Sequence, residues 1–286
     1  ATAHFQDHTT ARSLIPPHRR KTHSPGARFV HALCTLFTPF PNRQNHRVNP
    51  LASSAGSRYS PPMRLIALAL ILFLAACGRP LTTGETALLS QLYGESFATE
   101  RARLHNGALV GSVTFKRKKR PRLTCRERIF PEGRDEIVTT SPAAVALFNH
   151  VFFSKPFFSK DYMHGYPESM SLYAAMLLAH EATHIWQWQN RATTGYHPLK
   201  AAAEHSAVDD PYLFEIKTDN RFLDYPYEQQ ASLVEEYVCC TALDPDAPRT
   251  ARLHAMLSEA LPLQNIHIPQ KVSLPWNGAE TRNICR

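Results

Sequence analysis

One apolar stretch, residues 169–190, constrains this chain more than any other segment, because neither proline nor glycine interrupts it. Its apolar side chains recur at helical spacing and predict a long helix with a broad buried face: Met170, Tyr173, Ala174, Leu177 and Leu178. His180 and His184 stand one turn apart in this segment, with Glu181 directly after the first. Residues four apart share a helix face, so both imidazoles can point at one place.

Two imidazoles on one helix face suit Zn²⁺, which in catalytic sites takes three protein ligands and leaves a position for water. Glu181 follows the first histidine, so its carboxylate can reach that water rather than the metal. A carboxylate placed there can accept the proton of the water as it attacks a carbonyl. We therefore predict His180 and His184 as zinc ligands and Glu181 as the general base. The competing interpretation is two packed histidines without a metal.

The third ligand is expected on a later helix, predicted from Glu228 to Leu243 after Pro226. Glu228 fits best, because the small side chain of Ala231 would let this helix approach the histidine-bearing helix closely. Glu235, seven residues on, shares a face with Glu228. It is the alternative ligand or, if Glu228 binds, a partner that orients an imidazole. Glu236 or a further histidine remains a rival, and a solvated helix face is the competing interpretation for all three acids.

Hydrolysis also needs a group that stabilises the oxyanion. The sequence offers five candidates and does not rank them: Tyr196, His197, His205, Tyr227 and Tyr237. Trp186 and Trp188 are predicted to pack between helices rather than to bind a substrate.

A second constraint lies further upstream, where Met63 and Arg64 are followed by an apolar run and then by small residues before Cys77. This is the anatomy of a signal peptide, and the run is short for a bilayer span. Leu74–Cys77 resembles a bacterial lipobox, in which the cysteine becomes the lipidated first residue of the mature chain. We predict a lipoprotein signal peptide at residues 63–76 and lipidation of Cys77; the alternative is a buried helix or an uncleaved anchor.

The localisation follows from this segment. A lipidated Cys77 predicts a protein anchored in the bacterial cell envelope and facing the periplasm. Gly78 comes next, where no Asp stands; by similarity to the sorting rules of enteric bacteria this favours the outer membrane. Residues 1–62, rich in Pro, His and Arg, lack an apolar period that could build a core. We interpret them as a translated region upstream of Met63 or, alternatively, as a disordered basic arm.

The positive charge of the chain is confined to its start. The formal net charge is +8, and residues 1–62 hold eight Lys and Arg against one acid, with Arg64 adding one more. Residues 77–286 are therefore neutral, and nothing in their balance predicts binding to nucleic acid. The expected partners are a protein or peptide substrate and the membrane, while the oligomeric state is left open.

Residues 77–286 are long enough for one domain with a sizeable core, and their pattern predicts an α+β, mostly helical fold. Thr82 and Glu85 have capping-box spacing before a helix that ends at Gly94. Lys116–Arg120 is expected to be a solvated loop, and 145–153 to be core or a strand along a cleft. Other expected elements are strands at 101–105 and 108–115, helices at 199–205 and 250–261, and an extended end at 266–275.

Four cysteines remain in this domain: Cys125, Cys239, Cys240 and Cys285. An even number in an exported domain favours disulfides. Cys239 and Cys240 are adjacent and not expected to pair with each other, so bonds to Cys125 and Cys285 are reasonable, with the connectivity open.

The residues also carry a resemblance to a known family. The stretch His180–Gln189, His-Glu-Ala-Thr-His-Ile-Trp-Gln-Trp-Gln, resembles the zincin motif of bacterial Vgr-related proteins and the HExxH domain that accompanies extracellular contractile injection systems. Residues 81–240 are similar to that family overall, through the segments Leu81–Leu88, Tyr93–Gly94, Arg101–His105, Leu147–Phe153 and Glu228–Tyr237. The resemblance implies a compact zincin-like, metallopeptidase-like domain with the zinc-binding helix at its centre. The lipobox and the additional cysteines depart from the family and point to an envelope version.

The sequence thus predicts a zinc metallopeptidase, a hydrolase held at the membrane by a lipid on Cys77. His180, His184 and Glu228 would bind Zn²⁺, and Glu181 would activate water toward a peptide carbonyl. The alternative is a non-catalytic envelope lipoprotein that acts as a binding or assembly factor, with zinc structural or absent. Metal content separates the two.

Overall fold

The computed structural model of this protein describes residues 78–107, 114–215 and 219–286. The upstream segment 1–62, the signal peptide 63–76 and the lipidation site Cys77 lie outside the described residues and stay predictions, as does most of the strand expected at 108–115. Among the described residues, no helix is both long and apolar enough to cross a bilayer.

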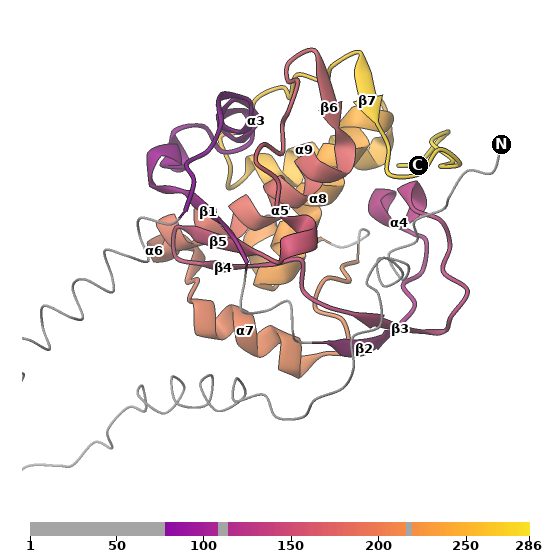
Figure 1. The fold of residues 1–286 in the computed structure, drawn as a ribbon, viewed down its shortest axis with the longest axis horizontal. Coiled ribbons are helices and arrows are strands. Elements are labelled where there is room, and N and C mark those ends of the chain that lie inside the picture. Colours follow the sequence, from indigo (N-terminus) through magenta and orange to yellow (C-terminus); the bar gives the residue numbers. More distant parts are fainter. Residues whose placement is uncertain (1–77, 108–113, 216–218) are drawn as a thin grey trace, which may run out of the picture. The chain divides into compact units, whose positions relative to one another are not determined.

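Two helices, α5 (Leu172–Gln189) and α8 (Tyr227–Leu243), pack against each other in the middle of the fold (Figure 1). The hydroxyl of Ser171 accepts a hydrogen bond from the Ala174 amide and caps α5. The long helix predicted at 169–190 is therefore confirmed from Leu172 on. Its first three residues, Ser169–Ser171, instead form strand β6, which pairs in parallel with β7 (Lys271–Ser273).

Helix α3 (Thr83–Tyr93) packs against α5 and begins with the predicted capping box. The Thr82 hydroxyl accepts from the Glu85 amide, and the Glu85 carboxylate accepts from the Thr82 amide. The helix ends at Gly94, whose φ of 49° favours glycine. At the last turn, the fully buried Tyr93 hydroxyl lies 2.7 Å from Thr183 Oγ1 and donates to the Ala179 carbonyl, both on α5.

A small sheet lies beside α5, with strand order β1 (Arg103–Asn106), β5 (His150–Phe153), β4 (Ala144–Leu147). β1 and β5 run in parallel, whereas β4 and β5 form an antiparallel hairpin. Val151 and Phe153 of β5 are buried, while Val145 and Leu147 of β4 are exposed. The interpretation of 145–153 as core therefore holds for its second half, and its first half is an edge strand.

The prediction of a solvated loop at Lys116–Arg120 is wrong. Residues Phe115–Lys118 form strand β2, which pairs antiparallel with β3 (Ile137–Thr140). The long aliphatic stems of Lys and Arg allow a charged run to form a half-covered strand when a β-branched partner strand is available. Arg120, just after the strand, is also not a freely solvated residue, because its Nη2 donates to Asp210 Oδ1 at 2.8 Å.

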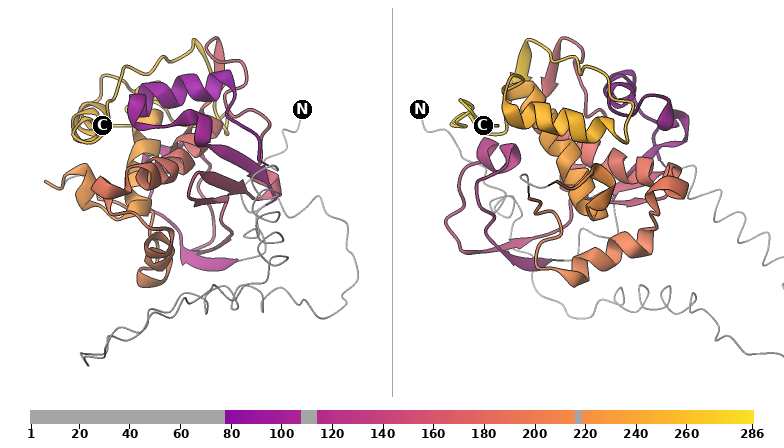
Figure 2. Two further views of the ribbon diagram at one scale, coloured as in Figure 1. Left: turned by 90° about the vertical axis from the view of Figure 1, so that its left-hand side faces the viewer. Right: turned by 180° about the vertical axis from the view of Figure 1, so that it is seen from behind.

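The remaining elements are short helices around the α5–α8 pair (Figure 2). They are α4 (Cys125–Ile129), α6 (Arg191–Thr194), α7 (Pro198–Ala207) and α9 (Pro248–Ser258), with 3₁₀ turns at Gly94–Ser96, Thr99–Arg101, Lys155–Phe157 and Phe222–Asp224. The residue bounds of α7 and α9 agree to within about three residues with those of the helices expected at 199–205 and 250–261. The α+β class is confirmed.

Two disulfides connect α8 with distant segments. Cys125 of α4 bonds to Cys239, and Cys285 near the C-terminus bonds to Cys240. All four side chains are fully buried. The two adjacent cysteines therefore pair outward, as expected, and the structure supplies the connectivity that the sequence left open.

Candidate metal centre

The predicted histidines lie together in the buried part of α5, with 5 % of each residue exposed. Their rings are 5.3 Å apart, and both Nε2 atoms face α8. Glu228, in the first turn of α8, meets them: its Oε2 lies 3.4 Å from Nε2 of His180 and 3.3 Å from Nε2 of His184. The two histidines and Glu228 form a cluster that could hold a metal ion, with all three ligand atoms within 4.8 Å of one another.

These separations suit a tetrahedral ion. Zinc bonds to nitrogen and oxygen of about 2.1 Å give neighbouring ligand atoms about 3.4 Å apart in a tetrahedron. The two nitrogen–oxygen distances, 3.4 and 3.3 Å, match that edge length and are longer than an ordinary N–H···O hydrogen bond. Two neutral nitrogens and one carboxylate are also the donor set that zinc takes in hydrolytic sites. The residues present therefore fit zinc.

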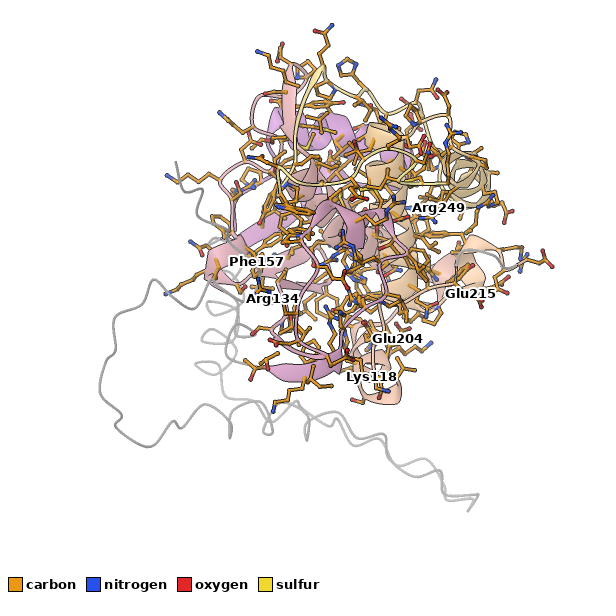
Figure 3. All side chains as sticks on the ribbon, turned by 90° about the vertical axis from the view of Figure 1, so that its right-hand side faces the viewer. Lys118, Arg134, Phe157, Glu204, Glu215 and Arg249 are labelled. Carbon is orange, nitrogen blue, oxygen red and sulfur yellow. A yellow bond between two sulfur atoms is a disulfide. The ribbon has the colours of Figure 1, made fainter. Side chains whose placement is uncertain are left out.

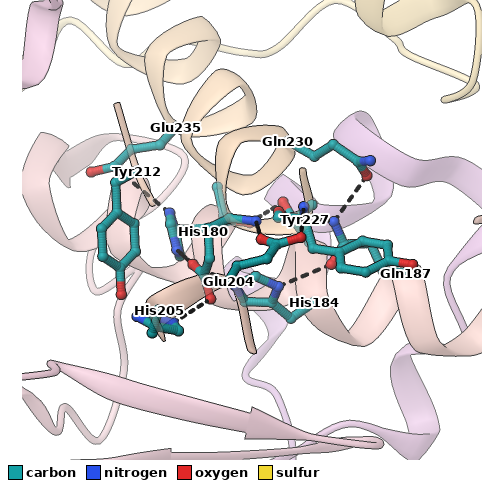
Figure 4. A network of polar contacts seen from close by, with 12 residues as sticks. His180, His184, Gln187, Glu204, His205, Tyr212, Tyr227, Gln230 and Glu235 are labelled. Atoms are coloured by element: carbon teal, nitrogen blue, oxygen red, sulfur yellow. Dashed lines mark hydrogen bonds and ion pairs between the residues drawn. The ribbon is translucent and has the colours of Figure 1, made fainter. Parts of the chain in front are cut away.

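Backbone capping places Glu228. α8 begins directly after Pro226, and Glu204 of α7 accepts hydrogen bonds from the amides of Tyr227 and Glu228 at 2.9 and 3.0 Å. A carboxylate at a helix N-terminus satisfies amides that have no partner within the helix. The network appears in Figure 4, where Glu204 and His205 of α7 lie beside the histidines of α5. His205 Nε2 lies 3.0 Å from the second Glu228 oxygen, Oε1.

The other nitrogen of each imidazole faces a polar side chain. Nδ1 of His184 lies 2.9 Å from Oε1 of Gln187, whose amide nitrogen donates to Gln230 and to the Tyr227 carbonyl. Nδ1 of His180 lies 3.3 Å from Oε2 of Glu235, an ion-pair contact, and makes no hydrogen bond to any of the described residues. Glu235 thus stands behind His180, on the side away from Glu228. Of the two predicted roles for Glu235, the geometry favours the one that orients an imidazole.

The other acid considered at this position, Glu236, points elsewhere. Its carboxylate accepts from the Cys125 amide and from Nη1 of Arg249, at 2.8 and 2.9 Å. Figure 3 shows Arg249 far from Glu204, which caps the opposite end of α8. Glu236 is therefore not part of the cluster, and its role as rival ligand does not hold.

The electrostatics of the cluster favour a cation. Burial disfavours a charged imidazole, yet the Glu228 and Glu235 carboxylates outweigh burial and raise the pKa of His180 to about 10. Glu228 likewise outweighs the effect of burial and raises the pKa of His184. Burial alone would raise the pKa of Glu228, but His184 and His180 hold it well below its usual value. Negative charge is thus in excess beside the imidazoles, which take up protons where no metal neutralises it.

Glu181, the predicted base, differs from the other buried acids. It is 6 % exposed, and within the described ranges no hydrogen bond or ion pair holds its carboxylate. Burial raises its pKa, and charge on His180 and His184 counteracts this only in part. A buried carboxylate without a partner is costly, so its retention here is typical of a functional position.

The five candidates for an oxyanion stabiliser separate clearly. The ring of Tyr196 lies 6.2 Å from that of His184, and His205 contacts Glu228. In contrast, Tyr237 faces His254 of α9, the His197 ring caps α7, and the Tyr227 hydroxyl donates to the Gly195 carbonyl. Trp186, as predicted, packs, with its indole N–H bonded to Ser96 Oγ.

Three residues near the cluster were not predicted from the sequence. Tyr212 lies 5.7 Å from the His180 ring and 5.6 Å from that of His205 (Figure 4). The Arg120 guanidinium lies over the Tyr212 ring, 5.1 Å from its centre. Arg126 pairs with Glu235, and Gln187 orients His184. Only Gln187 could have been identified from the sequence, because it lies three residues after His184 on the same helix.

Among the described residues, the Tyr196 and Tyr212 hydroxyls have no hydrogen-bond partner.

Comparison with known proteins gives one distant structural similarity. No family model matches the chain, and no curated protein matches it. Among solved structures, the effector domain of VgrG2b from Pseudomonas aeruginosa is similar at 22% identity with a TM-score of 0.41. The match covers 68% of this chain and 91% of that domain.

Proposed function

We propose that this protein is a zinc-dependent, metallopeptidase-like hydrolase of the bacterial cell envelope, anchored by a lipid on Cys77 and facing the periplasm. The observation that carries the proposal is the pairing of a His180–His184–Glu228 cluster with the unpartnered carboxylate of Glu181. A structural metal site needs no such carboxylate. A hydrolytic site does, because its water must lose a proton.

A bound zinc ion would lower the pKa of its water and polarise the carbonyl of a substrate. Glu181 would accept the proton of the water and return it to the leaving amine, since its buried carboxylate has a raised pKa and a free acceptor position. Glu228 would hold the metal with one oxygen while His205 fixes the other, at 3.0 Å. The Tyr196 hydroxyl, beside His184 and without a partner, is available to stabilise the oxyanion.

The experiment measures zinc content and hydrolysis on the same purified samples. Wild type, Glu181→Gln and His184→Ala are loaded with zinc, dialysed, and assayed against a mixed peptide library by mass spectrometry. Wild type should hold about one zinc per chain and cleave peptides, as the proposed three-ligand site requires. Glu181→Gln should keep the zinc while losing hydrolysis by 100-fold or more, on the order seen when a general base is removed. His184→Ala should lose both.

Glu168→Gln is the matched control, because Glu168 is exposed, precedes α5 and is not one of the residues of the cluster. It should behave as wild type. A wild type that holds zinc but cleaves nothing, with Glu181→Gln indistinguishable from it, would favour the non-catalytic binding or assembly lipoprotein. A wild type without zinc would remove the metal centre from the account altogether.

A further inference from the structure

The two histidines of the cluster are oriented by different means. The partner of His184 is Gln187, a neutral amide one turn further along the same helix. The partner of His180 is Glu235, a carboxylate on the opposite helix, 3.3 Å from Nδ1. The position of His184 therefore depends on α5 alone, whereas that of His180 depends on what holds Glu235.

Arg126 holds Glu235. Its Nη1 donates to both carboxylate oxygens, at 3.1 and 3.0 Å, and Glu235 itself is 3 % exposed. Among the described residues, no other side chain donates a hydrogen bond to the Glu235 carboxylate. Without this guanidinium, Glu235 would be a buried carboxylate with nothing to fix its position behind His180.

Arg126 stands on α4, a helix of five residues that is too short to be stable by itself. The adjacent residue, Cys125, attaches this helix to α8 twice. Its sulfur bonds to Cys239, and its amide donates to the Glu236 carboxylate at 2.8 Å. A covalent bond next to Arg126 therefore determines where the partner of Glu235 lies.

We propose that Arg126 and Glu235 are positioning residues of the metal centre, and that the Cys125–Cys239 disulfide keeps Arg126 in place, so that metal affinity depends on this bond. The inference rests on the proposed function. The chain of contacts runs from the disulfide through Arg126 and Glu235 to Nδ1 of His180, whose Nε2 faces the metal position. Loss of an outer partner of a metal-bound histidine lowers metal affinity by about 10- to 100-fold.

The neighbouring disulfide supplies a matched control. Cys240–Cys285 also leaves α8, from the next residue, but attaches the C-terminal segment. The Cys285 amide donates to Asp244, and within the described part of the chain no hydrogen bond or ion pair of Cys285 reaches the histidine cluster. Arg128 is the matching control within α4, because its Nη1 donates to the carbonyls of Asn283 and Ile284 rather than to Glu235.

The test is zinc affinity, measured by competition with a colorimetric chelator on the full chain. Arg126→Met, Glu235→Gln and the double variant Cys125→Ala/Cys239→Ala should each bind zinc about 10- to 100-fold more weakly than wild type. Arg126→Lys, which keeps the charge, should recover part of the loss. Arg128→Met and Cys240→Ala/Cys285→Ala should stay within about threefold, because they leave this chain of contacts intact.

The outcomes separate the two claims. A wild type that binds no zinc overturns both the proposed function and this inference. A wild type that binds zinc, with Arg126→Met and Glu235→Gln also within threefold of it, overturns only the positioning role. Equal losses in the Arg126→Met and Arg128→Met variants would assign the effect to general loosening of α4 and would also overturn it. The single-residue variants decide the positioning role of Arg126 and Glu235 even if the disulfide variant does not fold.

Discussion

Removal of either disulfide should destabilise the fold by a similar and large amount. The perturbations are the double variants Cys125→Ala/Cys239→Ala and Cys240→Ala/Cys285→Ala. The two bonds leave adjacent, fully buried residues of α8, so local burial is the same in both cases. What differs is the span of chain that each bond closes, 114 residues in the first case and 45 in the second.

The expected magnitudes follow from these spans. In the chain-entropy description, a disulfide stabilises by restricting the unfolded chain, and the effect grows with the logarithm of the loop length. Spans of 114 and 45 residues correspond to about 4.8 and about 4.0 kcal/mol at 25 °C. A more than twofold difference in span therefore changes the expected loss by less than about 1 kcal/mol.

The assay is equilibrium unfolding in urea, followed by tryptophan fluorescence with EDTA throughout, so that metal binding does not contribute. Each double variant should lose several kcal/mol, with the larger loss for Cys125→Ala/Cys239→Ala. A loss below about 1 kcal/mol in either variant, at an unchanged slope against urea, would refute the loop-entropy reasoning. Similar stability losses with different zinc affinities would separate the positioning effect of Cys125–Cys239 from its contribution to folding.

Three further predictions concern the metal, the helix contact and pH. Zinc at about 100 times its dissociation constant should add about 2.7 kcal/mol to the free energy of unfolding, raising the melting temperature by roughly 5–10 °C, and His184→Ala should abolish the shift in a thermal melt with and without EDTA. Tyr93→Phe should lower the free energy of unfolding in urea by about 1 kcal/mol, because it removes the buried hydrogen bonds of the hydroxyl to Thr183 and Ala179. The zinc content should not change, and an unchanged free energy of unfolding would contradict the assignment of these contacts as hydrogen bonds. Burial raises the pKa of Asp210, but Arg120 outweighs this and lowers it, so the stability that this carboxylate contributes should be complete above its unfolded pKa of about 3.9 and lost as pH falls through the lower folded value. The difference in urea midpoint between wild type and Asp210→Asn should therefore shrink from pH 6 to pH 3, and a constant difference would contradict the ion pair.

The parts of this fold that the sequence predicts are those set by neighbouring residues. The cap at Thr82 and the stop at Gly94 depend on side chains within one turn, and both were predictable. The course of α5 follows from its uninterrupted apolar spacing, and the shared face of His180 and His184 from helical geometry alone. Only the first turn differs, because Ser169–Ser171 pairs with β7, a segment 102 residues further along the chain.

The parts that the sequence does not predict depend on distant partners. Arg126 and Tyr212 reach the cluster from segments whose own patterns carry no sign of it. The error at Lys116–Arg120 has the same origin, since a charged run reads as solvated until its partner strand Ile137–Thr140 is known. The local sequence pattern predicts a helix and the metal-ligand candidates on it, but the residues that contact those candidates from other segments are known only from the tertiary structure.

The periodicity of α8 explains why Glu228 and Glu235 both face the histidines whereas Glu236 does not. Seven residues advance a straight helix by almost two full turns, so Glu228 and Glu235 lie within about 20° of each other, whereas Glu236 is displaced by about 80°. Cys239 stands one turn beyond Glu235 and Cys240 one turn beyond Glu236, which makes two adjacent columns. In the first column, Glu228 and Glu235 contact the histidines and Cys239 bonds to α4. In the second, Glu236 contacts Arg249 and Cys240 bonds to the C-terminal segment. Once one residue of the first column faces the histidines, the roles of the others follow from the helical repeat.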